Sequence, residues 1–366
     1  MSQSHLRPLT PRDLHHCLSL HLDPVEGSPY WSRRREELGL PWPPAEESFE
    51  DFCRSFAFRS RDDQARYERD LRELPIEMFI PRRVLREARW LWASETGGTT
   101  GIAKRGTWGD KYWRNILDFS DEMLDLHGVP RDRNWLFVGP TGPHTTGRLV
   151  ISIGERRGGR VFCIDMDPRI VRLYIAEGNR DATERYVRHI WEQVTPILRH
   201  QNVGVLFCTA SLLEMLPRYL DVRLLEQVQA VVHAGLAMSR DTDAFLRAEL
   251  FAGKPVVGIY GTSVSGISFQ KPSEPEDDHR VIYIPSEPHV VLQAIDDRGE
   301  TVPYGAEGEL RCFRFTEDQL IPGFVERDRA TRVRPFGRVA QTYSWDWLGD
   351  PHSPSSLSGQ AMEGVY

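Results

Sequence analysis

The chain is organised around one stretch rich in glycine and threonine, which reads Ser94-Glu95-Thr96-Gly97-Gly98-Thr99-Thr100-Gly101-Ile102-Ala103-Lys104. Glycine has no Cβ, so the backbone N–H groups of such a stretch can converge on an anion. Threonine hydroxyls add neutral hydrogen-bond donors, and a lysine side chain supplies a mobile positive charge. These groups suit a polyphosphate, and a flexible surface loop is the simpler alternative.

The stretch differs from the P-loop, whose pattern is G-x-x-x-x-G-K-[ST]. Lys104 follows Ile102 and Ala103 rather than a glycine, and Arg105 stands where the P-loop has serine or threonine. The polyphosphate would therefore be held by a loop of another type.

Beyond this stretch, short apolar runs predict buried β-strands at 135–138, 160–164, 203–207, 228–232 and 256–260. Between them apolar residues repeat with the period of a helix, as in 113–124 and 187–198. Strands that alternate with helices predict parallel βαβ crossovers with helices on both faces. The fold class is therefore α/β, with layered, doubly wound and mostly parallel sheets. Ligands bind beyond the carboxyl ends of such strands, so the loops after Val138, Val232 and Tyr260 are candidates for the site.

The regions on either side of this α/β pattern differ from it in composition and in the spacing of their apolar runs. Residues 1–90 are rich in proline, arginine and glutamate and predict a helical entry segment, which precedes the α/β part at 90–264. Short strands at 267–269, 281–284, 290–292 and 310–313, separated by turn residues, predict a small antiparallel β subdomain within a β-rich part at 265–350. Residues 351–366 are rich in serine, proline and glycine and predict a flexible tail.

Composition limits the class of partner. The chain has 366 residues, 40% of them apolar and 27% charged, and a net charge of −7 without a long basic block. Nucleic acid and membranes are therefore not expected as partners. The run Arg33–Arg35 is followed by Glu36 and Glu37, which predicts a solvated helix face. The five scattered cysteines form no C-x-x-C pair, and the start of the chain has no apolar signal core, so we expect a cytoplasmic protein.

The phosphate-binding stretch resembles that of the acyl- and aryl-CoA synthetase (ANL) superfamily of adenylating enzymes, which is usually T-S-G-T-T-G-x-P-K. Gly97 replaces the usual serine, and Ala103 replaces the usual proline. The resemblance implies that ATP is a cofactor and that Thr99 and Lys104 take part in catalysis. The residues that it implies for binding the phosphates are Thr96, Gly97, Gly98, Thr99, Thr100, Gly101 and Lys104.

Two later segments resemble nucleotide-binding motifs of the same superfamily. Residues 234–238, Ala-Gly-Leu-Ala-Met, are similar to G-G-A-x-[LM], which implies that Ala234 and Gly235 border the adenine. A strand-to-helix turn that requires glycine is the alternative. Residues 259–264, Ile-Tyr-Gly-Thr-Ser-Val, resemble Y-G-x-[ST]-E. This implies nucleotide contacts from Tyr260, Gly261, Thr262 and Ser263, with the purine against Tyr260 and the α-phosphate, and hence catalysis, at Ser263.

The second of these motifs departs from the superfamily at its last position, where Val264 replaces a glutamate that helps to hold Mg²⁺. A hard divalent cation prefers oxygen ligands, and valine has none. Mg²⁺ is still expected as a cofactor, but its ligands are unknown. Either another carboxylate or water completes the shell of the ion, or the metal-dependent chemistry is impaired.

Residues 324–328, Phe-Val-Glu-Arg-Asp, resemble Y-R-T-R-D and are most similar to the phenylacetate-CoA ligase branch. This implies that Asp328 accepts hydrogen bonds from the ribose hydroxyls, whereas a surface ion pair is the alternative. Residues 139–147 follow a predicted strand and open a helix, and the corresponding loop of the superfamily borders the acyl substrate. We therefore expect His144 and Gly142 to contact the substrate, and a loop histidine without a ligand is the alternative.

The ordered matches span about 90–330 and imply one AMP-binding domain over residues 1–350. The implied activity is ATP-dependent adenylation of an aromatic carboxylic acid, such as a phenazine carboxylate, to an acyl-AMP. A partner reductase would then form an aldehyde in antibiotic biosynthesis, or another acyl acceptor protein would take the acyl group. Lys271 is the last lysine of the chain, and the resemblance therefore implies a form without the C-terminal domain, as in truncated members that act in phenazine antibiotic biosynthesis.

Two other functions stay open. The chain could be a nucleotide-binding accessory module with impaired catalysis, or one half of a CoA or carrier ligase that receives a C-terminal domain in trans. A homodimer is a further expectation for the assembly.

Overall fold

The structure, a computed structural model, describes residues 6–95, 104–235, 238–262, 266–277 and 279–353. The chain forms two compact units, each assembled from separate segments. Unit 1 comprises residues 1–119, 262–267 and 284–348, and unit 2 comprises residues 120–261, 268–283 and 349–366. The predicted tail at 351–366 lies almost wholly outside the described residues.

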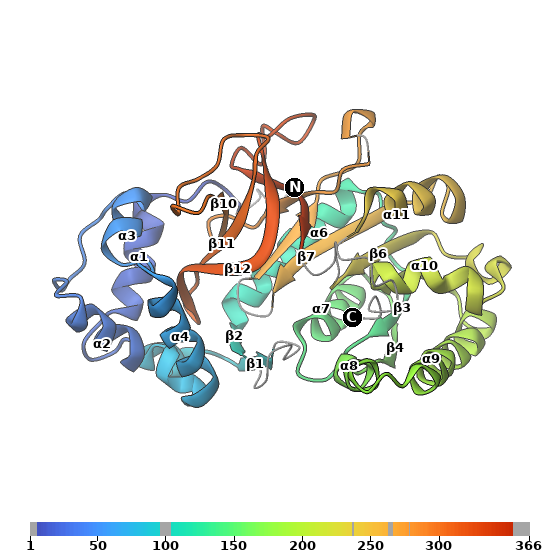
Figure 1. The fold of residues 1–366 in the computed structure, drawn as a ribbon, viewed down its shortest axis with the longest axis horizontal. Helices are drawn as coiled ribbons and strands as arrows, with labels where there is room; N and C mark the ends of the chain where they lie inside the picture. The colour runs from blue at the N-terminus through green and yellow to red at the C-terminus, as the bar shows by residue number, and fades with distance from the viewer. Residues whose placement is uncertain (1–5, 96–103, 236–237, 263–265, 278, 354–366) are drawn as a thin grey trace. The chain divides into compact units, whose positions relative to one another are not determined.

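Unit 2 is built on a parallel sheet (Figure 1). Its strands run in the order β7-β6-β5-β3-β4, and each pair in this series is parallel. The strands are β3 (Asn134–Gly139), β4 (Val161–Asp165), β5 (Val203–Cys208), β6 (Ala230–Ala234) and β7 (Val256–Thr262). These positions confirm the strands predicted from the apolar runs. Strands β3, β5 and β6 are buried almost throughout, whereas β4 is partly exposed.

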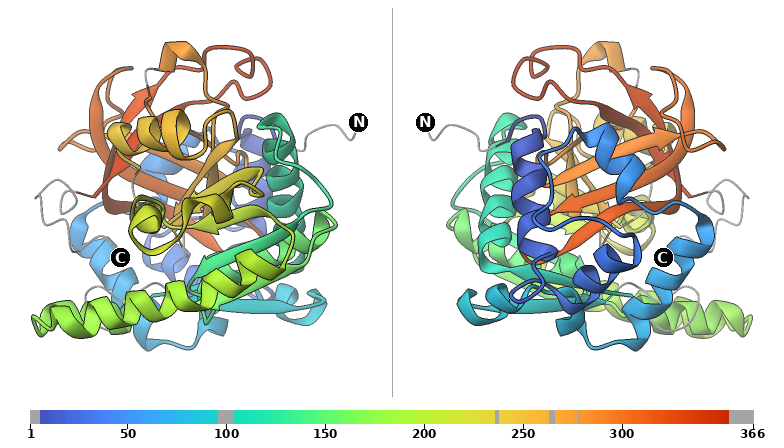
Figure 2. Two further views of the ribbon diagram at one scale, coloured as in Figure 1. Left: turned by 90° about the vertical axis from the view of Figure 1, so that its right-hand side faces the viewer. Right: turned by 90° about the vertical axis from the view of Figure 1, so that its left-hand side faces the viewer.

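Helices cover both faces of this sheet, as the sequence predicted. On one face Leu136 and Val138 of β3 pack in a core with residues of α9 (Arg180–His200) and α10 (Ala210–Tyr219). On the other face α7 (Thr145–Arg156) lies so close to the strands that a Cβ at Gly154 would come within 2.4 Å of Val161 and 3.2 Å of Trp135. Figure 2 shows α9 as the long yellow-green helix at the foot of its left-hand view. The unit is therefore a doubly wound α/β structure.

The remaining elements of unit 2 are short. They are α8 (Pro168–Ala176), a 3₁₀ turn at Val222–Leu225, α11 (Arg240–Phe245), a π turn at Leu246–Leu250 and a 3₁₀ turn at Pro275–Asp277. Four further elements contain residues of both units, as does β7 through its last residue, Thr262. They are α6 (Asp110–Leu126), β8 (Gly266–Gln270), β9 (Ile282–Pro285) and β13 (Trp347–His352).

Unit 1 joins the helical entry segment to a small antiparallel sheet, and both were predicted. The sheet contains β10 (Val290–Ile295), β11 (Glu307–Phe315) and β12 (Leu320–Val333), which pair in that order. Apolar residues of the first helices, such as Leu18 and Phe52, share a core with Phe313 and Ile321 of the sheet. The helices are α1 (Pro11–His21), α2 (Pro29–Glu37), α3 (Phe49–Ser55), α4 (Arg61–Glu73), a 3₁₀ turn at Ile76–Phe79 and α5 (Arg82–Glu87).

The arginine run of α2 forms only in part the solvated face that the sequence predicted, because Arg33 is exposed whereas Arg34 and Arg35 are buried. Arg34 and Arg35 are each only 8% exposed. Arg34 forms a bidentate ion pair with Asp63 at 2.6 and 2.7 Å, and its guanidinium lies over the rings of Phe56 and Phe58. The paired guanidinium and its apolar stem are thus packed beneath α4 and the segment before it, because arginine can be buried where a carboxylate and aromatic faces receive it.

A hairpin of unit 1 carries the ends of the phosphate-binding stretch. Its strands are β1 (Leu91–Glu95) and β2 (Arg105–Gly109), which pair antiparallel with Glu95 opposite Arg105. The turn between β11 and β12 is hydrogen-bonded to β2. Asp318 accepts a hydrogen bond from the Gly109 N–H at 2.9 Å, and Gln319 accepts one from the Thr107 N–H at 2.9 Å.

Arg314, near the end of β11, links this turn to β2 through further hydrogen bonds. Its side chain is fully buried and donates to the Thr107 carbonyl at 2.6 Å and to the Asp318 carboxylate at 2.7 Å. The guanidinium lies 4.4 and 4.5 Å from the ring centres of Trp108 and Tyr112, two rings that stack on each other with their centres 5.7 Å apart. These contacts fix the strand that begins directly after Lys104.

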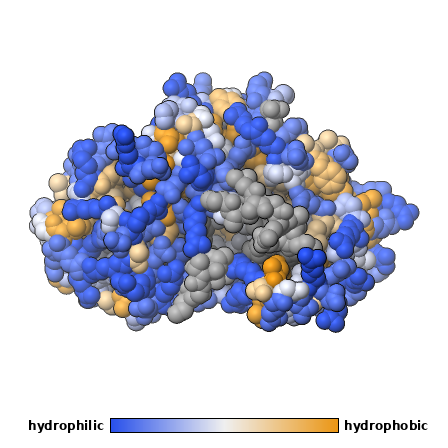
Figure 3. All heavy atoms as spheres, viewed as in Figure 1, coloured by the Kyte–Doolittle hydropathy of each residue, from blue (hydrophilic) through white to orange (hydrophobic). Residues whose placement is uncertain are grey.

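None of the described helices is both long enough and apolar enough to cross a bilayer. The face drawn in Figure 3 is mostly hydrophilic with smaller apolar areas between the charged side chains. The large apolar side chains that are exposed in the described chain, Val25, Leu85, Leu126, Leu173, Val222 and Tyr304, come from separate elements.

Candidate functional site

The predicted site residues fall in both units. Residues 96–103 and Ser263, which include most of the predicted phosphate contacts and Thr99, lie outside the described residues. Lys104, Thr262 and Asp328 belong to unit 1, whereas Gly142, His144, Ala234, Gly235, Tyr260 and Gly261 belong to unit 2. We therefore describe the two groups separately.

In unit 1 the fold brings Lys104 to strand β12, far from it in the sequence. The Lys104 Nζ lies 4.0 Å from Glu326 Oε2 and 4.3 Å from the centre of the Phe324 ring. Both charged side chains are largely buried, with 16% of the Lys104 side chain and 15% of the Glu326 side chain exposed. The Lys104 ammonium thus lies close to a carboxylate and to the face of an aromatic ring.

Strand β12 bulges where Glu326 and Asp328 occur. Arg311 of β11 pairs with Val325 and Glu309 pairs with Arg329, so residues 326–328 of β12 all lie opposite Leu310. Within the bulge Arg327 is exposed, whereas Glu326 and Asp328 on either side of it are partly buried. Bulges re-aim side chains and are frequent beside active sites.

This arrangement places the predicted phosphate lysine near the predicted ribose carboxylate. Asp328 lies two residues from Glu326, a distance of about 6 to 7 Å along an extended strand. A lysine can neutralise phosphate oxygens, and a carboxylate can accept hydrogen bonds from two vicinal hydroxyls. The roles of Lys104 and Asp328 in binding a nucleotide stay predictions. The motif comparison did not identify Glu326, although a carboxylate two residues before Asp328 was visible in the sequence.

In unit 2 the other predicted residues gather at the carboxyl edge of the sheet. Ala234 ends β6 and pairs with Ile259 of β7, so Gly235 and Tyr260 come next on neighbouring strands. Gly142 and His144 follow β3, whose Gly139 pairs with Asp165 at the end of β4. The loops after β3, β6 and β7 therefore share one edge, because parallel strands end on the same side of a sheet.

Tyr260 and Gly235 have local roles as well. The Tyr260 ring is partly buried and lies 5.6 Å from the Tyr283 ring at an interplanar angle of 50°. Gly235 has φ of +90°, a backbone conformation that strongly favours glycine, and it precedes α11 by a few residues. Gly235 therefore lies in a turn that requires glycine, as one of the two interpretations of this segment predicted. The contact between Gly235 and adenine stays a prediction.

His144 stands at the N-cap of α7 with an unusual surrounding. It is 8% exposed, makes no capping hydrogen bond, and its Nε2 atom is buried without a hydrogen-bond partner among the described residues. The buried Oγ1 of Thr145 likewise lacks a described partner. Similar buried atoms occur elsewhere among the described residues, for example both ring nitrogens of His233, so a ligand at His144 stays a prediction.

The electrostatics at His144 favour the neutral imidazole. Burial lowers the pKa of His144, and the nearby Arg169 lowers it further, while Asp167 and Asp165 oppose this effect. A neutral imidazole can donate one hydrogen bond without carrying charge. The α7 N-terminus can supply backbone N–H donors in addition, which together suit a carboxylate.

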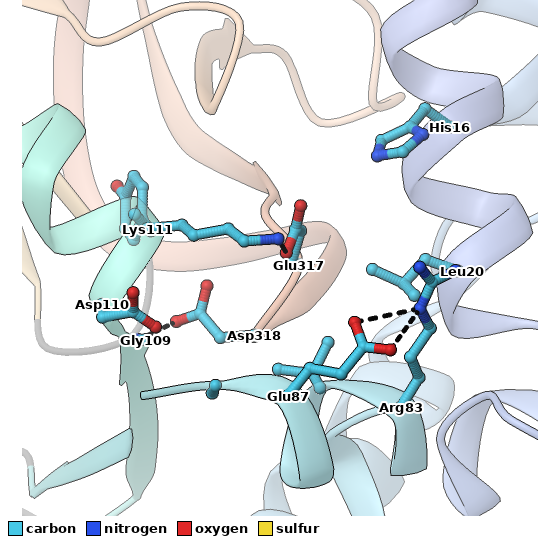
Figure 4. A pocket seen from close by; sticks show the side chains of 12 residues that line it. His16, Leu20, Arg83, Glu87, Gly109, Asp110, Lys111, Glu317 and Asp318 are labelled. Carbon is cyan, nitrogen blue, oxygen red and sulfur yellow. Dashed lines mark hydrogen bonds and ion pairs between the residues drawn. The ribbon is translucent and has the colours of Figure 1, made fainter. Parts of the chain in front are cut away.

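Unit 1 also contains two adjacent cavities that the sequence did not predict. One of about 240 Å³ lies between α1, α5 and the start of α6, and Figure 4 shows the ion pairs Lys111–Glu317 and Arg83–Glu87 at its sides. The other, of about 590 Å³, shares His16, Lys111, Tyr112 and Glu317 with the first. None of the predicted site residues lines either cavity.

The described residues include no group of three or more histidine, cysteine, aspartate or glutamate side chains placed to hold a metal ion. Mg²⁺ that accompanies a nucleotide usually keeps several waters and takes only one or two carboxylates besides phosphate oxygens. Glu326 and Asp328 fit such a partial shell, whereas a metal held by protein groups alone would not fit.

Comparisons with known proteins give the fold. No protein-family model matches the sequence, and no curated protein sequence matches it. An open conformation of 2-hydroxyisobutyryl-CoA ligase, in complex with 2-HIB-AMP and CoA, aligns over 94% of this chain and 72% of its own, with 14% identity and a TM-score of 0.62. The same ligase in the thioesterification state aligns over 88% and 63%, with 14% identity and a TM-score of 0.59.

The postadenylation state of that ligase, in complex with 2-HIB-AMP, gives a TM-score of 0.59 at 14% identity and is covered over 62% of its length. At 14% identity these comparisons establish the fold alone. Any activity has to be argued from the residues of the site. The chain therefore has the mixed α/β fold of this acyl-CoA ligase over almost all of its length.

Proposed function

We propose that the protein activates a carboxylic acid by ATP-dependent adenylation. The observation that carries this proposal is the position of Lys104 against strand β12, 4.0 Å from Glu326 and beside the bulge that contains Asp328. A lysine for phosphate and a carboxylate for ribose are thereby close together in one unit. The fold shared with a ligase that was crystallised with an acyl-adenylate supports the same proposal.

In the proposed reaction a carboxylate oxygen of the acid attacks the α-phosphorus of ATP. The bond from that phosphorus to the bridging oxygen breaks, pyrophosphate leaves, and the acyl-adenylate remains, with no net proton transferred. Such chemistry depends on positioning and on neutralising charge on phosphate oxygens. Lys104 would stabilise the charge that grows on the pyrophosphate, and Asp328 would orient the ribose.

Further roles rest on the residue matches. Thr99, Thr100 and Gly101 would bind the β- and γ-phosphates together with Lys104, and Ser263 would contact the α-phosphate. Tyr260, Ala234 and Gly235 would border the adenine. We propose that His144 and the α7 N-terminus receive the acid, supported by the two buried polar atoms without partners. An aromatic acid, such as a phenazine carboxylate, and delivery of the acyl group to a partner reductase or acceptor protein rest on the resemblance alone.

Exchange of labelled pyrophosphate into ATP, measured with a panel of aryl and alkyl carboxylic acids, tests this function. We expect exchange that depends on the acid and is strongest with aromatic acids. Nucleotide binding without exchange for any acid would instead support an accessory module. Exchange that appears only after a separate lysine-containing domain is added would support a half-enzyme.

A further inference from the structure

The loop that connects β3 to α7, residues 140–144, is fastened to the neighbouring strand by one side chain. Thr141 donates two hydrogen bonds to the Asp165 Oδ1 atom, one from its backbone N–H and one from its hydroxyl, each at 2.7 Å. Asp165 is the last residue of β4 and pairs with Gly139, the last residue of β3. All of these residues belong to unit 2. The loop is therefore tied to β4 at its second residue.

The first turn of α7 packs on the same threonine. A Cβ at Gly147 would lie 2.6 Å from the Thr141 Cα and 2.8 Å from the Pro140 carbonyl oxygen, so the close approach requires glycine. Thr141 thus contacts both the end of β4 and the start of α7. His144 follows it by three residues, and Pro140 and Pro143 each restrict the backbone of the loop. A displacement of Thr141 should therefore be transmitted to His144.

We propose that Asp165 is a positioning residue of the acid site, which holds Thr141 and thereby sets where His144 meets the carboxylate of the acid. This inference rests on the proposed function, because it takes the loop to receive the acid. Asp165 acts through its hydrogen bonds to the loop rather than by contact with the acid, whose negative charge its own carboxylate would repel. Adenylation depends on the position of the attacking carboxylate, so the fixation of this loop bears on the reaction.

An effect of the Asp165 charge on His144 is the alternative, and a neighbouring residue provides its control. Burial lowers the pKa of His144, as do Arg169 and Arg172, whereas Asp167 and Asp165 raise it. The Asp167 carboxylate accepts hydrogen bonds from the backbone and the side chain of Arg169, at the start of α8. Asp167 therefore shares the electrostatic effect on His144, while its carboxylate is bonded to α8 instead of the loop.

The test measures acid-dependent exchange of labelled pyrophosphate into ATP at pH 8, with KM determined separately for ATP and for the acid that the wild type uses best. Asp165→Ala removes both the acceptor and the charge. Asp165→Asn removes the charge but keeps an oxygen that can accept the hydrogen bonds of Thr141. Asp167→Asn is the matched control, because it removes the neighbouring charge alone. Thermal unfolding checks that each variant is folded.

We expect Asp165→Ala to raise KM for the acid by roughly tenfold, as for the loss of one hydrogen bond to the acid, and to leave KM for ATP unchanged. Asp165→Asn and Asp167→Asn should both remain close to the wild type. Combining Asp165→Ala with His144→Ala should raise KM for the acid no further than His144→Ala alone, because a residue that acts through His144 has no effect without it. Thr141→Val removes one of the two hydrogen bonds and should raise this KM by a smaller factor, which provides a second variant if Asp165→Ala is unstable.

The outcomes separate this inference from the proposed function. If the wild type shows no exchange with any acid of the panel, the proposed function and the role of Asp165 are both wrong. If exchange is present and KM for the acid is unchanged in Asp165→Ala, only the role of Asp165 is wrong. Equal rises of this KM in Asp165→Asn and Asp167→Asn would indicate a charge effect and would also overturn the positioning role. Full additivity with His144→Ala would show that Asp165 does not act through His144.

Discussion

Replacing Arg314 by methionine should destabilise unit 1 strongly, because this side chain ties three segments together. It donates hydrogen bonds to Thr107, Thr316, Asp318 and Gln319 at 2.6 to 3.1 Å and is fully buried. Methionine keeps the apolar stem but leaves the Asp318 carboxylate buried without a cation. Breaking one partner of a buried ion pair costs about 3 to 5 kcal/mol, and we expect a loss in this range.

The pH dependence of the variant follows from Asp318. Burial raises the pKa of Asp318 in the native protein, and the charge of Arg314 opposes this rise. Without Arg314 the pKa should rise further, so the native state binds the proton more tightly than the unfolded chain. The stability contributed by that proton is present at low pH and lost as the pH rises through the native pKa, so the variant should be less impaired at pH 5 than at pH 8.

Urea unfolding monitored by tryptophan fluorescence measures these effects, because Trp108 lies against Arg314. Arg334→Met is the matched control: it also removes an arginine that lies over an aromatic ring, but an exposed one, and should change stability by less than about 0.5 kcal/mol. In the double variant Arg314→Met/Asp318→Asn we expect about 1 to 3 kcal/mol of non-additivity. Additive losses, or a loss below about 1 kcal/mol in Arg314→Met, would refute the reasoning.

Four further predictions concern the proposed site and one buried carboxylate. Asp328→Ala should weaken AMP binding by about 1 to 3 kcal/mol in calorimetry, since the ribose hydroxyls lose a charged acceptor, and an unchanged affinity would contradict the ribose assignment. Lys104→Ala should reduce pyrophosphate exchange far more than AMP binding, because AMP has no β- or γ-phosphate; intact exchange at saturating ATP would exclude a catalytic role. His144→Ala should raise KM for the acid by about tenfold with little change in kcat. His144→Gln should retain more activity, because the native imidazole is neutral at pH 7 and glutamine is also a neutral hydrogen-bond donor. An unchanged KM in the alanine variant would show that His144 does not bind the acid. Burial raises the pKa of Glu287 from 4.5 to about 7, so the stability that its bound proton contributes is lost as the pH rises through this range. In urea unfolding, the free energy of unfolding of Glu287→Gln relative to the wild type should therefore increase by roughly 2 kcal/mol from pH 5 to pH 8. A difference that does not change with pH would contradict the raised pKa.

The α/β class and the positions of the main strands and helices could be predicted from local patterns in the sequence. Apolar runs such as 203–207 and helical periods such as 187–198 reflect local geometry, because a strand repeats every two residues and a helix every 3.6. The order of strands and helices then requires parallel crossovers, and the carboxyl ends of the strands share an edge for the same reason. The placement of His144, Gly235 and Tyr260 at that edge could therefore be predicted without coordinates.

Contacts between residues far apart in the sequence depend on long-range packing and could not be predicted in this way. Lys104 approaches Glu326 because a bulge in β12 lies beside the end of the β1–β2 hairpin, and no local pattern encodes that pairing. The burial of Arg34 was likewise hidden, since its neighbours in sequence are charged and its partner Asp63 comes from another helix. Local periodicity specifies the face of an element, whereas long-range packing selects the element that covers this face.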